Sequence, residues 1–334
     1  MNITILGAGS FGTAMGKHLA DLGNDVKLWT IDAKQAEYIN ERNINNFCFQ
    51  NTVLPKKITC TLDIKEAFEF SDRCIVAIPT QFVREVCKKA APYAGKETHI
   101  LNLAKGIEIT TGNLLHSIYN EALPEAAYSA LSGPSHAEEV LIECPTTVAL
   151  ASKDEEEAKS WQNIVSGANF RAYTGTDVVG LEVGGAIKNI YAVAAGMSQA
   201  MKLGDNAVAA LATRGLAEMM RFGIRLGASP LTLSGLAGVG DLMVTCYSMH
   251  SRNFRLGLAI GGGMSFDEAV DSLGQVAEGA YTVRAVVENS RKFNVEMPLA
   301  DAVYRVLYKG EKPKELLREL FARPLKSEMK LENK

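Results

Sequence analysis

The sequence predicts an α/β domain with a doubly wound, mainly parallel sheet, followed by an all-α domain. Apolar strand-like runs alternate with helical segments through the first half of the chain, which is typical of a parallel sheet covered on both faces. From about Asp177 the strand-like runs stop, and long segments rich in Ala, Gly, Leu and Met follow one another. We expect one domain over residues 1–178, an all-helical domain over 179–323 and a charged, frayed tail over 324–334.

Short apolar runs bounded by turn residues predict the strands. In chain order they cover residues 2–6, 26–29, 57–61, 73–78, 99–103, 127–131 and 146–150. Apolar residues at helical spacing predict the helices. In the first half a helix begins at about Phe11 and stops at Gly23-Asn24, Asp63 caps another, and two more cover 81–89 and 155–165. The helical segments of the second half are 181–201, 207–226, 254–259, 281–292 and 300–307.

A glycine-rich loop, Gly7-Ala8-Gly9-Ser10-Phe11-Gly12, follows the first strand directly and opens the first helix. In this setting Gly7 permits a tight turn, Gly9 lets the backbone approach a pyrophosphate, and Gly12 lets helix and strand pack closely. The helix N-terminus offers N–H groups and a partial positive charge to the phosphates. The pattern favours a Rossmann-like dinucleotide site over the alternative, a turn that only connects strand and helix.

The end of the second strand bears on which dinucleotide is bound. An Asp or Glu at this place usually receives the 2′-hydroxyl of the ribose. Asp32 comes slightly late for that role, and Lys34 is close enough to meet a 2′-phosphate. NAD and NADP therefore both stay open as the cofactor.

The composition is that of an ordinary soluble globular protein of 334 residues, with 47% hydrophobic and 22% charged residues. A net charge of −3 gives no reason to expect nucleic acid or an anionic membrane as a partner. The chain begins directly with a strand, and no apolar run approaches the ~18 residues of a spanning helix, so we expect neither a signal peptide nor membrane insertion. The six cysteines form no C-x-x-C pair, which disfavours zinc and fits reduced thiols in a cytoplasmic enzyme.

Lys188 is the first candidate for chemistry, because hydride transfer to a carbonyl needs a proton donor beside the reacting atom. It lies in a stripe of small residues on one helical face: Gly184, Gly185, Ala192 and Ala195. Such a stripe indicates that another backbone or a ligand comes close. A lysine there is partly desolvated, which moves its pKa toward the working pH. The alternative is a lysine that extends to the surface.

A second unusual segment is the glycine-rich stretch 235–240, which is followed by Asp241 and Thr245 at helical spacing. A carboxylate in these apolar surroundings needs a cationic or hydrogen-bonding partner, and Lys188 is a candidate. The alternative is that Asp241 merely caps a helix.

Ser251-Arg252-Asn253 opens another helix, with Ser251 expected as its cap. Backbone N–H groups, the helix dipole and a forked cation together suit a phosphate, so a phosphorylated substrate is indicated. The alternative is a solvated helix start.

Three further positions border the expected cleft. Lys105 follows a strand at its carboxyl end, where ligands bind in such sheets. Segment 132–137 is a turn that leads into a helix, and its His136 alone is more typical of a structural residue. Glu278 is either a site residue or a helix-cap neighbour.

Taken together, these motifs resemble the NAD(P)-dependent glycerol-3-phosphate dehydrogenase family. The matching segments keep the family's order over nearly the whole chain: 7–12, 103–106, 132–137, 188–189, 238–242, 251–253 and 276–279. The resemblance implies a doubly wound N-terminal domain and an all-α C-terminal domain, usually as a homodimer. It also implies the reversible reduction of dihydroxyacetone phosphate to sn-glycerol 3-phosphate, which feeds phospholipid synthesis.

The resemblance assigns roles to the matching residues. Lys188, with Asn189 beside it, is the expected proton donor and acceptor at substrate C2. Asp241 and Thr245 are expected to orient Lys188 and the substrate hydroxyls. The other expected substrate contacts are Lys105, Gly133, Ser135, Ser251, Arg252 and Asn253. The expected cofactor contacts are Gly7, Gly9, Ser10, Phe11, Gly12, Lys105, Ala137, Arg252, Val276 and Glu278, and no metal is expected.

One departure from the family pattern concerns the cofactor, because members that prefer NADP often carry a basic residue where this chain has Ile31, next to Asp32. Two other functions are alternatives. One is another two-domain reductase that acts on a hydroxy acid such as 6-phosphogluconate, against which segment 241–253 argues. The other is a non-catalytic dinucleotide sensor, which needs the glycine loop but none of the candidate catalytic residues.

Overall fold

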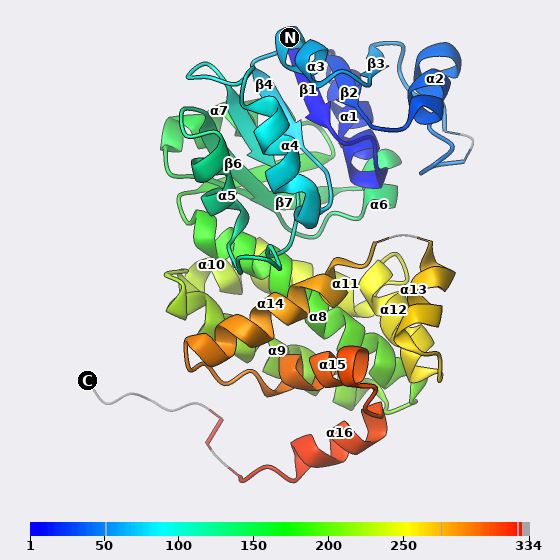
Figure 1. Ribbon diagram of the computed structural model, residues 1–334, viewed down its shortest axis with the longest axis vertical. Coiled ribbons are helices and arrows are strands. Elements are labelled where there is room, and N and C mark those ends of the chain that lie inside the picture. Colours follow the sequence, from blue (N-terminus) through cyan, green and yellow to red (C-terminus); the bar gives the residue numbers. More distant parts are fainter. Residues whose placement is uncertain (51, 275, 326, 329–334) are drawn as a thin grey trace.

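The computed structural model describes residues 1–50, 52–274, 276–325 and 327–328. A sheet with its covering helices forms the upper part in Figure 1, and helices alone form the lower part. The last strand ends at Gly175 and the first helix of the lower part begins at Val178. The predicted fold class is therefore confirmed. The tail expected over 324–334 lies largely outside the described residues.

The sheet has eight strands: β1 (Asn2–Leu6), β2 (Asp25–Trp29), β3 (Ile58–Thr61), β4 (Arg73–Val76), β5 (His99–Asn102), β6 (Ala127–Ser132), β7 (Thr146–Ser152) and β8 (Phe170–Gly175). Their spatial order is β3-β2-β1-β4-β5-β6-β7-β8, and every neighbouring pair is parallel except β6 and β7. The strand order reverses between β1 and β4. The carboxyl ends of these two strands therefore border a crevice of the kind in which doubly wound sheets bind ligands.

Helices cover both faces of the sheet, as a doubly wound fold requires. They are α1 (Ser10–Asp21), α2 (Ala33–Arg42), α3 (Ile64–Phe70), η1 (Thr80–Phe82), α4 (Val83–Ala90), α5 (Leu115–Ala122), α6 (Ala137–Leu141) and α7 (Glu155–Val165). Met15 of α1 and Trp161 of α7 belong to the buried cluster on one face. Phe68 of α3, Val86 of α4 and Ile118 of α5 belong to the cluster on the other face.

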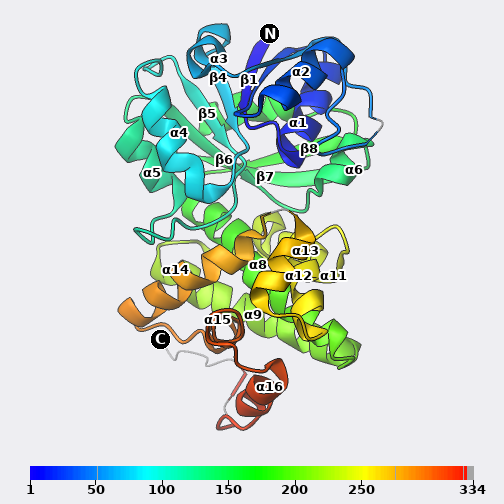
Figure 2. The ribbon, with the colours of Figure 1, turned by 45° about the vertical axis from the view of Figure 1, so that its right-hand side comes forward.

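The lower part is organised around one long helix, α8 (Val178–Ala200), which is buried along nearly its whole length. The other elements of this part are α9 (Asp205–Arg225), α10 (Pro230–Ser234), the π-helical turn η2 (Leu236–Gly240), α11 (Asp241–Tyr247), α12 (Arg252–Gly261), α13 (Phe266–Leu273), α14 (Glu278–Lys292), α15 (Pro298–Lys309) and α16 (Pro313–Phe321). Figure 2 shows α8 among α9, α12 and α14. Among the described residues α8 alone is long and apolar enough to cross a membrane. Because 94% of its most apolar window is buried inside the protein, its composition fits a core helix.

Several elements were not predicted from the sequence. Strand β8 is one, since only Phe170 and Ala172 of its residues are buried. The short or polar helices α2, α5, α10, α13 and α16 are others. The helix expected over 81–89 begins instead as the 3₁₀ turn η1 and continues as α4. All six cysteines are free, and four of them are buried.

Candidate active site

The glycine loop at the end of β1 has the geometry that its three glycines predict. Gly7 has a φ of +114°, and a Cβ there would lie 2.6 Å from the Ala77 carbonyl oxygen at the end of β4. A Cβ at Gly12 would lie 1.9 Å from the Gly7 carbonyl oxygen, so helix and turn pack without room for a side chain. A Cβ at Gly9 would meet nothing within 4 Å, because Gly9 borders an open cleft. Within the described residues no side chain caps α1 and its first turn holds no acid, which suits an anion at this helix N-terminus.

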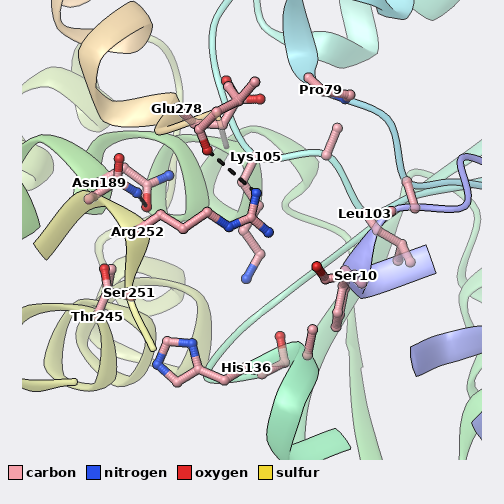
Figure 3. A pocket seen from close by; sticks show the side chains of 18 of the residues that line it. Ser10, Pro79, Leu103, Lys105, His136, Asn189, Thr245, Ser251, Arg252 and Glu278 are labelled. Carbon is pink, nitrogen blue, oxygen red and sulfur yellow. Dashed lines mark hydrogen bonds between the residues drawn. The ribbon is translucent and has the colours of Figure 1, made fainter. Parts of the chain in front are cut away.

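The cleft next to this loop is lined by residues of both parts of the molecule (Figure 3). The predicted site residues that line it are Gly9, Ser10, Phe11, Lys105, Ser135, Ala137, Lys188, Asn189, Thr245, Ser251, Arg252, Asn253, Val276 and Glu278. The predicted site residues that do not line it are Gly7, Gly12, Gly133 and Asp241. Asp241 and the Gly133 carbonyl oxygen accept hydrogen bonds from the lining residue Lys105, and Gly7 and Gly12 belong to the tight turn next to Gly9. His136 and His250 also line the cleft, with ring centroids 5.6 Å apart.

Lys188 lies in the middle of α8 and is only 6% exposed, so the alternative of a surface lysine is wrong. The small residues beside it let other segments approach the helix. A Cβ at Gly184 would come within 2.4 Å of the Ala237 carbonyl oxygen in η2, and at Gly185 within 2.5 Å of Ser132 Oγ at the end of β6. The predicted close approach along this stripe is confirmed, and it places the lysine between η2 and the sheet.

Asp241 joins two lysines from different parts of the molecule. Its carboxylate accepts hydrogen bonds from Lys188 of α8 and, at 2.8 Å, from Lys105 in the loop after β5. Lys105 also donates to the Gly133 carbonyl oxygen at 3.0 Å. The N-cap of α11 is Gly240, and no side chain within the described residues caps this helix, so the alternative that Asp241 is merely a cap is wrong. Asp241 is 1% exposed, and its charge is therefore directed at the lysines.

Burial sets the proton affinities of this group. It lowers the pKa of Lys188 to about 8, with the Asp241 carboxylate opposing the shift and the Lys105 ammonium adding to it. Burial alone would raise the pKa of Asp241, but Lys105 and Lys188 outweigh it and hold that pKa below its usual value. Thr245 adds a hydrogen bond, because its Oγ accepts from Lys188 Nζ at 2.8 Å. Lys188 is thus protonated at neutral pH and able to exchange its proton slightly above it.

The N-terminus of α12 forms another wall of the cleft. Ser251 is its cap, as predicted, and accepts from the Phe254 amide at 3.1 Å. The Arg252 guanidinium extends into the cleft in Figure 3 and donates to the Val276 carbonyl oxygen at 3.4 Å. A forked cation beside a helix N-terminus is a suitable receptor for a phosphate.

Two asparagines connect this helix to α8 beside Lys188. Asn253 Nδ2 donates to Asn189 Oδ1 at 2.9 Å, and Asn253 Oδ1 accepts from the Gly279 amide at 2.8 Å. The Asn189 amide nitrogen donates to the Gly185 carbonyl oxygen of α8 at 3.3 Å, so both ends of the Asn189 side chain are held beside Lys188.

Glu278 lies at the seam between the two parts. It is the first residue of α14, and its Oε1 accepts from the Thr80 amide, just after β4, at 3.0 Å. Its Oε2 and the Thr80 Oγ are buried and have no hydrogen-bond partner within the described residues. Burial raises the pKa of Glu278 to about 7, while the Thr80 amide and the Arg252 charge oppose that shift. Of the two residues only Glu278 lines the cleft, so its unpartnered oxygen is the one suited to a polar ligand there.

Asp32 and Lys34 both lie at the start of α2, just after the end of β2. Asp32 caps α2 and accepts from the amides of Lys34 and Gln35 at 2.9 and 3.1 Å. Ile31 is 85% exposed beside it. The structure also shows contacts that the sequence analysis missed, because Thr80 and Glu278 are 198 residues apart and no local pattern connects them.

Comparison with known proteins identifies the family. Models of the NAD-dependent glycerol-3-phosphate dehydrogenase N-terminus and C-terminus match residues 2–158 and 177–318. The NAD(P)+ glycerol-3-phosphate dehydrogenase of Bacillus subtilis (strain 168) is 43% identical over 330 residues, which cover 98% of this chain and 96% of that protein. The chain belongs to the NAD-dependent glycerol-3-phosphate dehydrogenase family. The family member of Geobacillus thermodenitrificans is 45% identical to it over 331 residues, again 98% of this chain and 96% of that protein.

Solved structures agree with this family assignment. The glycerol-3-phosphate dehydrogenase of Coxiella burnetii superposes with a TM-score of 0.93 at 37% identity and covers 96% of this chain and 99% of its own. D-mandelate dehydrogenase superposes with a TM-score of 0.62 at 18% identity, covering 93% of this chain and 98% of its own. At that identity the likeness shows a shared fold alone.

Proposed function

We propose that this glycerol-3-phosphate dehydrogenase family member catalyses the reversible NAD(P)H-dependent reduction of dihydroxyacetone phosphate to sn-glycerol 3-phosphate. The observation that carries the proposal is a buried lysine, hydrogen-bonded to Asp241 and Thr245, in the same cleft as a dinucleotide loop and a phosphate-type helix N-terminus. The three features match the three parts of the reaction, which are proton transfer, hydride transfer and recognition of the substrate phosphate.

Residues 1–178 form the dinucleotide-binding domain in this proposal. Gly9, with Ser10 and Phe11 at the start of α1, receives the cofactor phosphates, while Gly7 and Gly12 permit the tight turn and the close packing behind it. The further proposed cofactor contacts also line the cleft: Lys105, Ala137, Arg252, Val276 and Glu278. When bound, the nicotinamide supplies or accepts the hydride at substrate C2.

Residues 179–323 form the substrate domain, and Lys188 is its general acid and base. The Lys188 ammonium donates its proton to the oxygen that becomes the C2 hydroxyl, which accelerates such steps by ~10²–10⁴. Asp241 and Thr245 keep the ammonium in place, because both accept hydrogen bonds from it. In the reverse direction, the neutral amine of Lys188 takes the proton from the C2 hydroxyl.

The substrate phosphate binds at the N-terminus of α12 in this account, held by Ser251, Arg252 and Asn253. Phosphate binding at a distance from C2 supplies binding energy that orients the carbonyl toward Lys188. The other proposed substrate contacts come from the sheet side of the cleft and from α8: Lys105, Gly133, Ser135 and Asn189.

The test is to add dihydroxyacetone phosphate to the protein with NADH, and separately with NADPH, and to follow the loss of reduced-cofactor absorbance. We expect loss with at least one cofactor and much slower loss with unphosphorylated dihydroxyacetone. Binding of a dinucleotide without any turnover would favour the sensor. Turnover of 6-phosphogluconate with NAD+ or NADP+, but not of sn-glycerol 3-phosphate, would favour the hydroxy-acid reductase.

We further propose that the enzyme works as a homodimer in the cytoplasm and supplies glycerophospholipid synthesis. The resemblance to the family supports the dimer, and six free cysteines fit a reducing compartment. Light scattering of the purified protein tests the dimer, since a monomer mass at micromolar concentration would contradict it.

A further inference from the structure

The carbonyl oxygen of Ala8, inside the glycine loop, is surrounded by hydrogen-bond donors. Gln35 Nε2 donates to it at 2.8 Å, Asn45 Nδ2 at 2.9 Å and Thr13 Oγ at 3.2 Å. The Cys48 thiol adds a weak contact at 3.6 Å. One backbone carbonyl has two lone pairs. This oxygen therefore receives more donors than a loop carbonyl needs to be satisfied.

The donors are themselves held in place. Gln35 is 8%, Asn45 1% and Thr13 0% exposed. Gln35 Oε1 accepts from Thr30 Oγ at 2.6 Å, and Gln35 Nε2 also donates to Asn45 Oδ1 at 3.2 Å. Asn45 Nδ2 donates to Thr13 Oγ as well, at 2.8 Å. The network thus joins α1, the end of β2, α2 and the segment after α2 around a single oxygen.

The direction of this carbonyl determines the direction of the next amide. The peptide bond is planar and trans, so the Ala8 C=O and the Gly9 N–H point in opposite directions. With the oxygen held in the protein interior, the Gly9 N–H is turned toward the cleft that Gly9 lines. Hydrogen bonds to the carbonyl also polarise the peptide unit, which strengthens that N–H as a donor. Outward N–H groups of this kind bind phosphate oxygens.

We propose that Asn45 and Gln35 are positioning residues of the dinucleotide site. They hold the Ala8 carbonyl inward and thereby present the Gly9 N–H to the cofactor diphosphate, without touching the cofactor themselves. This inference rests on the proposed dinucleotide binding and adds to it two residues from outside the glycine motif.

The test uses Asn45→Leu and Gln35→Met, which nearly conserve side-chain volume and remove the donors without adding charge. NADH and NADPH binding is measured by calorimetric titration of the full chain, together with the melting temperature without ligand. Loss of one such hydrogen bond is expected to weaken binding of the preferred dinucleotide about 3- to 10-fold. In steady-state assays the KM for that dinucleotide rises by the same factor, while the KM for dihydroxyacetone phosphate and kcat at saturation stay near wild type.

Asn40→Leu is the matched control, because Asn40 is on α2 like Gln35 and its side chain also bonds a backbone group, that of Cys60. Its Nδ2 donates to the Cys60 carbonyl oxygen at 2.9 Å, and its Oδ1 accepts from the Cys60 amide at 2.7 Å. This variant is expected to lose stability but to bind the dinucleotide like the wild type.

The outcomes separate this inference from the proposed function. Wild-type affinity in Asn45→Leu and Gln35→Met would overturn the positioning role, and so would an equal loss of affinity in Asn40→Leu. If Asn45→Leu does not fold, Gln35→Met decides alone. If the wild-type protein binds neither NADH nor NADPH, the proposed function itself fails.

Discussion

Replacing Asp241 by Asn removes one negative charge from between two ammonium groups and keeps the shape of the side chain. Asp241 accepts hydrogen bonds from both Lys188 and Lys105, and it is 1% exposed. Without the carboxylate, the buried Lys188 and the partly buried Lys105 repel each other across the position of Asp241. We expect this change to act mainly on the protonation of Lys188.

The size of the effect follows from the contact. Two unit charges about 4 Å apart interact by about 4 kcal/mol at an effective dielectric constant of about 20. Because about 1.4 kcal/mol corresponds to one pKa unit, loss of the carboxylate lowers the pKa of Lys188 by about 3 units from its value of about 8. The protonated fraction at pH 7 then falls from about nine-tenths to about one-hundredth, so reduction at pH 7 slows roughly 100-fold.

The assay is the pH dependence of kcat for both directions of the reaction. In the wild type, reduction needs the Lys188 ammonium, so the rate of reduction is maximal well below pH 8 and is lost as the pH rises through about 8, where Lys188 titrates. The rate of oxidation needs the neutral amine and rises over the same pH range. In Asp241→Asn the falling limb of reduction moves to acid pH. Thr245→Val is the control, since it removes a hydrogen bond to Lys188 but no charge, and its limb stays near 8. If reduction by Asp241→Asn still falls off at about pH 8 and proceeds at the wild-type rate, Asp241 does not control the protonation of Lys188.

Three other predictions test the two binding sites. Arg252→Ala raises the KM for dihydroxyacetone phosphate about 10-fold or more, because it removes charge-assisted hydrogen bonds. At saturating dinucleotide the turnover of unphosphorylated dihydroxyacetone is unaffected in steady-state assays, and an unchanged KM for dihydroxyacetone phosphate would remove Arg252 from the phosphate site. Gly9→Ala leaves the melting temperature near wild type but weakens dinucleotide binding in titrations. Gly7→Ala instead lowers the melting temperature, since its Cβ would lie 2.6 Å from the Ala77 carbonyl oxygen at a φ of +114°. A stable Gly7→Ala protein together with an unstable Gly9→Ala protein would contradict the assigned geometry. Asp32→Ala raises the affinity for NADP+ relative to NAD+. In the wild type the Asp32 carboxylate accepts from the first amides of α2 and repels a 2′-phosphate at that helix. An unchanged ratio of the two affinities would show that Asp32 does not discriminate between NADP+ and NAD+.

The features that the sequence predicts correctly are those set by neighbouring residues in the chain. The glycine loop, the cap at Ser251 and the helical face of Lys188 each depend on residues close together in the chain, and the structure has all three as expected. Strand β8 was missed because it alternates buried Phe170 and Ala172 with exposed residues at the edge of the sheet. A pattern of two apolar residues is too short to distinguish a strand from a loop.

The site is only partly predictable for a related reason. Lys188 and Asp241 are both identifiable as unusual residues, but the Lys105–Asp241 ion pair spans 136 residues and depends on how the sheet meets α11. The contact of Asn45 with the Ala8 carbonyl spans 37 residues and connects the segment after α2 to the glycine loop before α1. Nothing in the residues around Asn45 indicates that partner, since an asparagine after a helix is usually a cap or a turn residue.

In the proposed mechanism Lys188 supplies the proton during reduction at C2. This role is measured by the single-turnover rate of NADH or NADPH oxidation by Lys188→Met with saturating dihydroxyacetone phosphate. We expect the rate to fall by about 10²–10⁴, with dinucleotide affinity unchanged in a parallel titration. A rate close to that of the wild type would contradict the role of Lys188 as proton donor, because the proton would then come from another group.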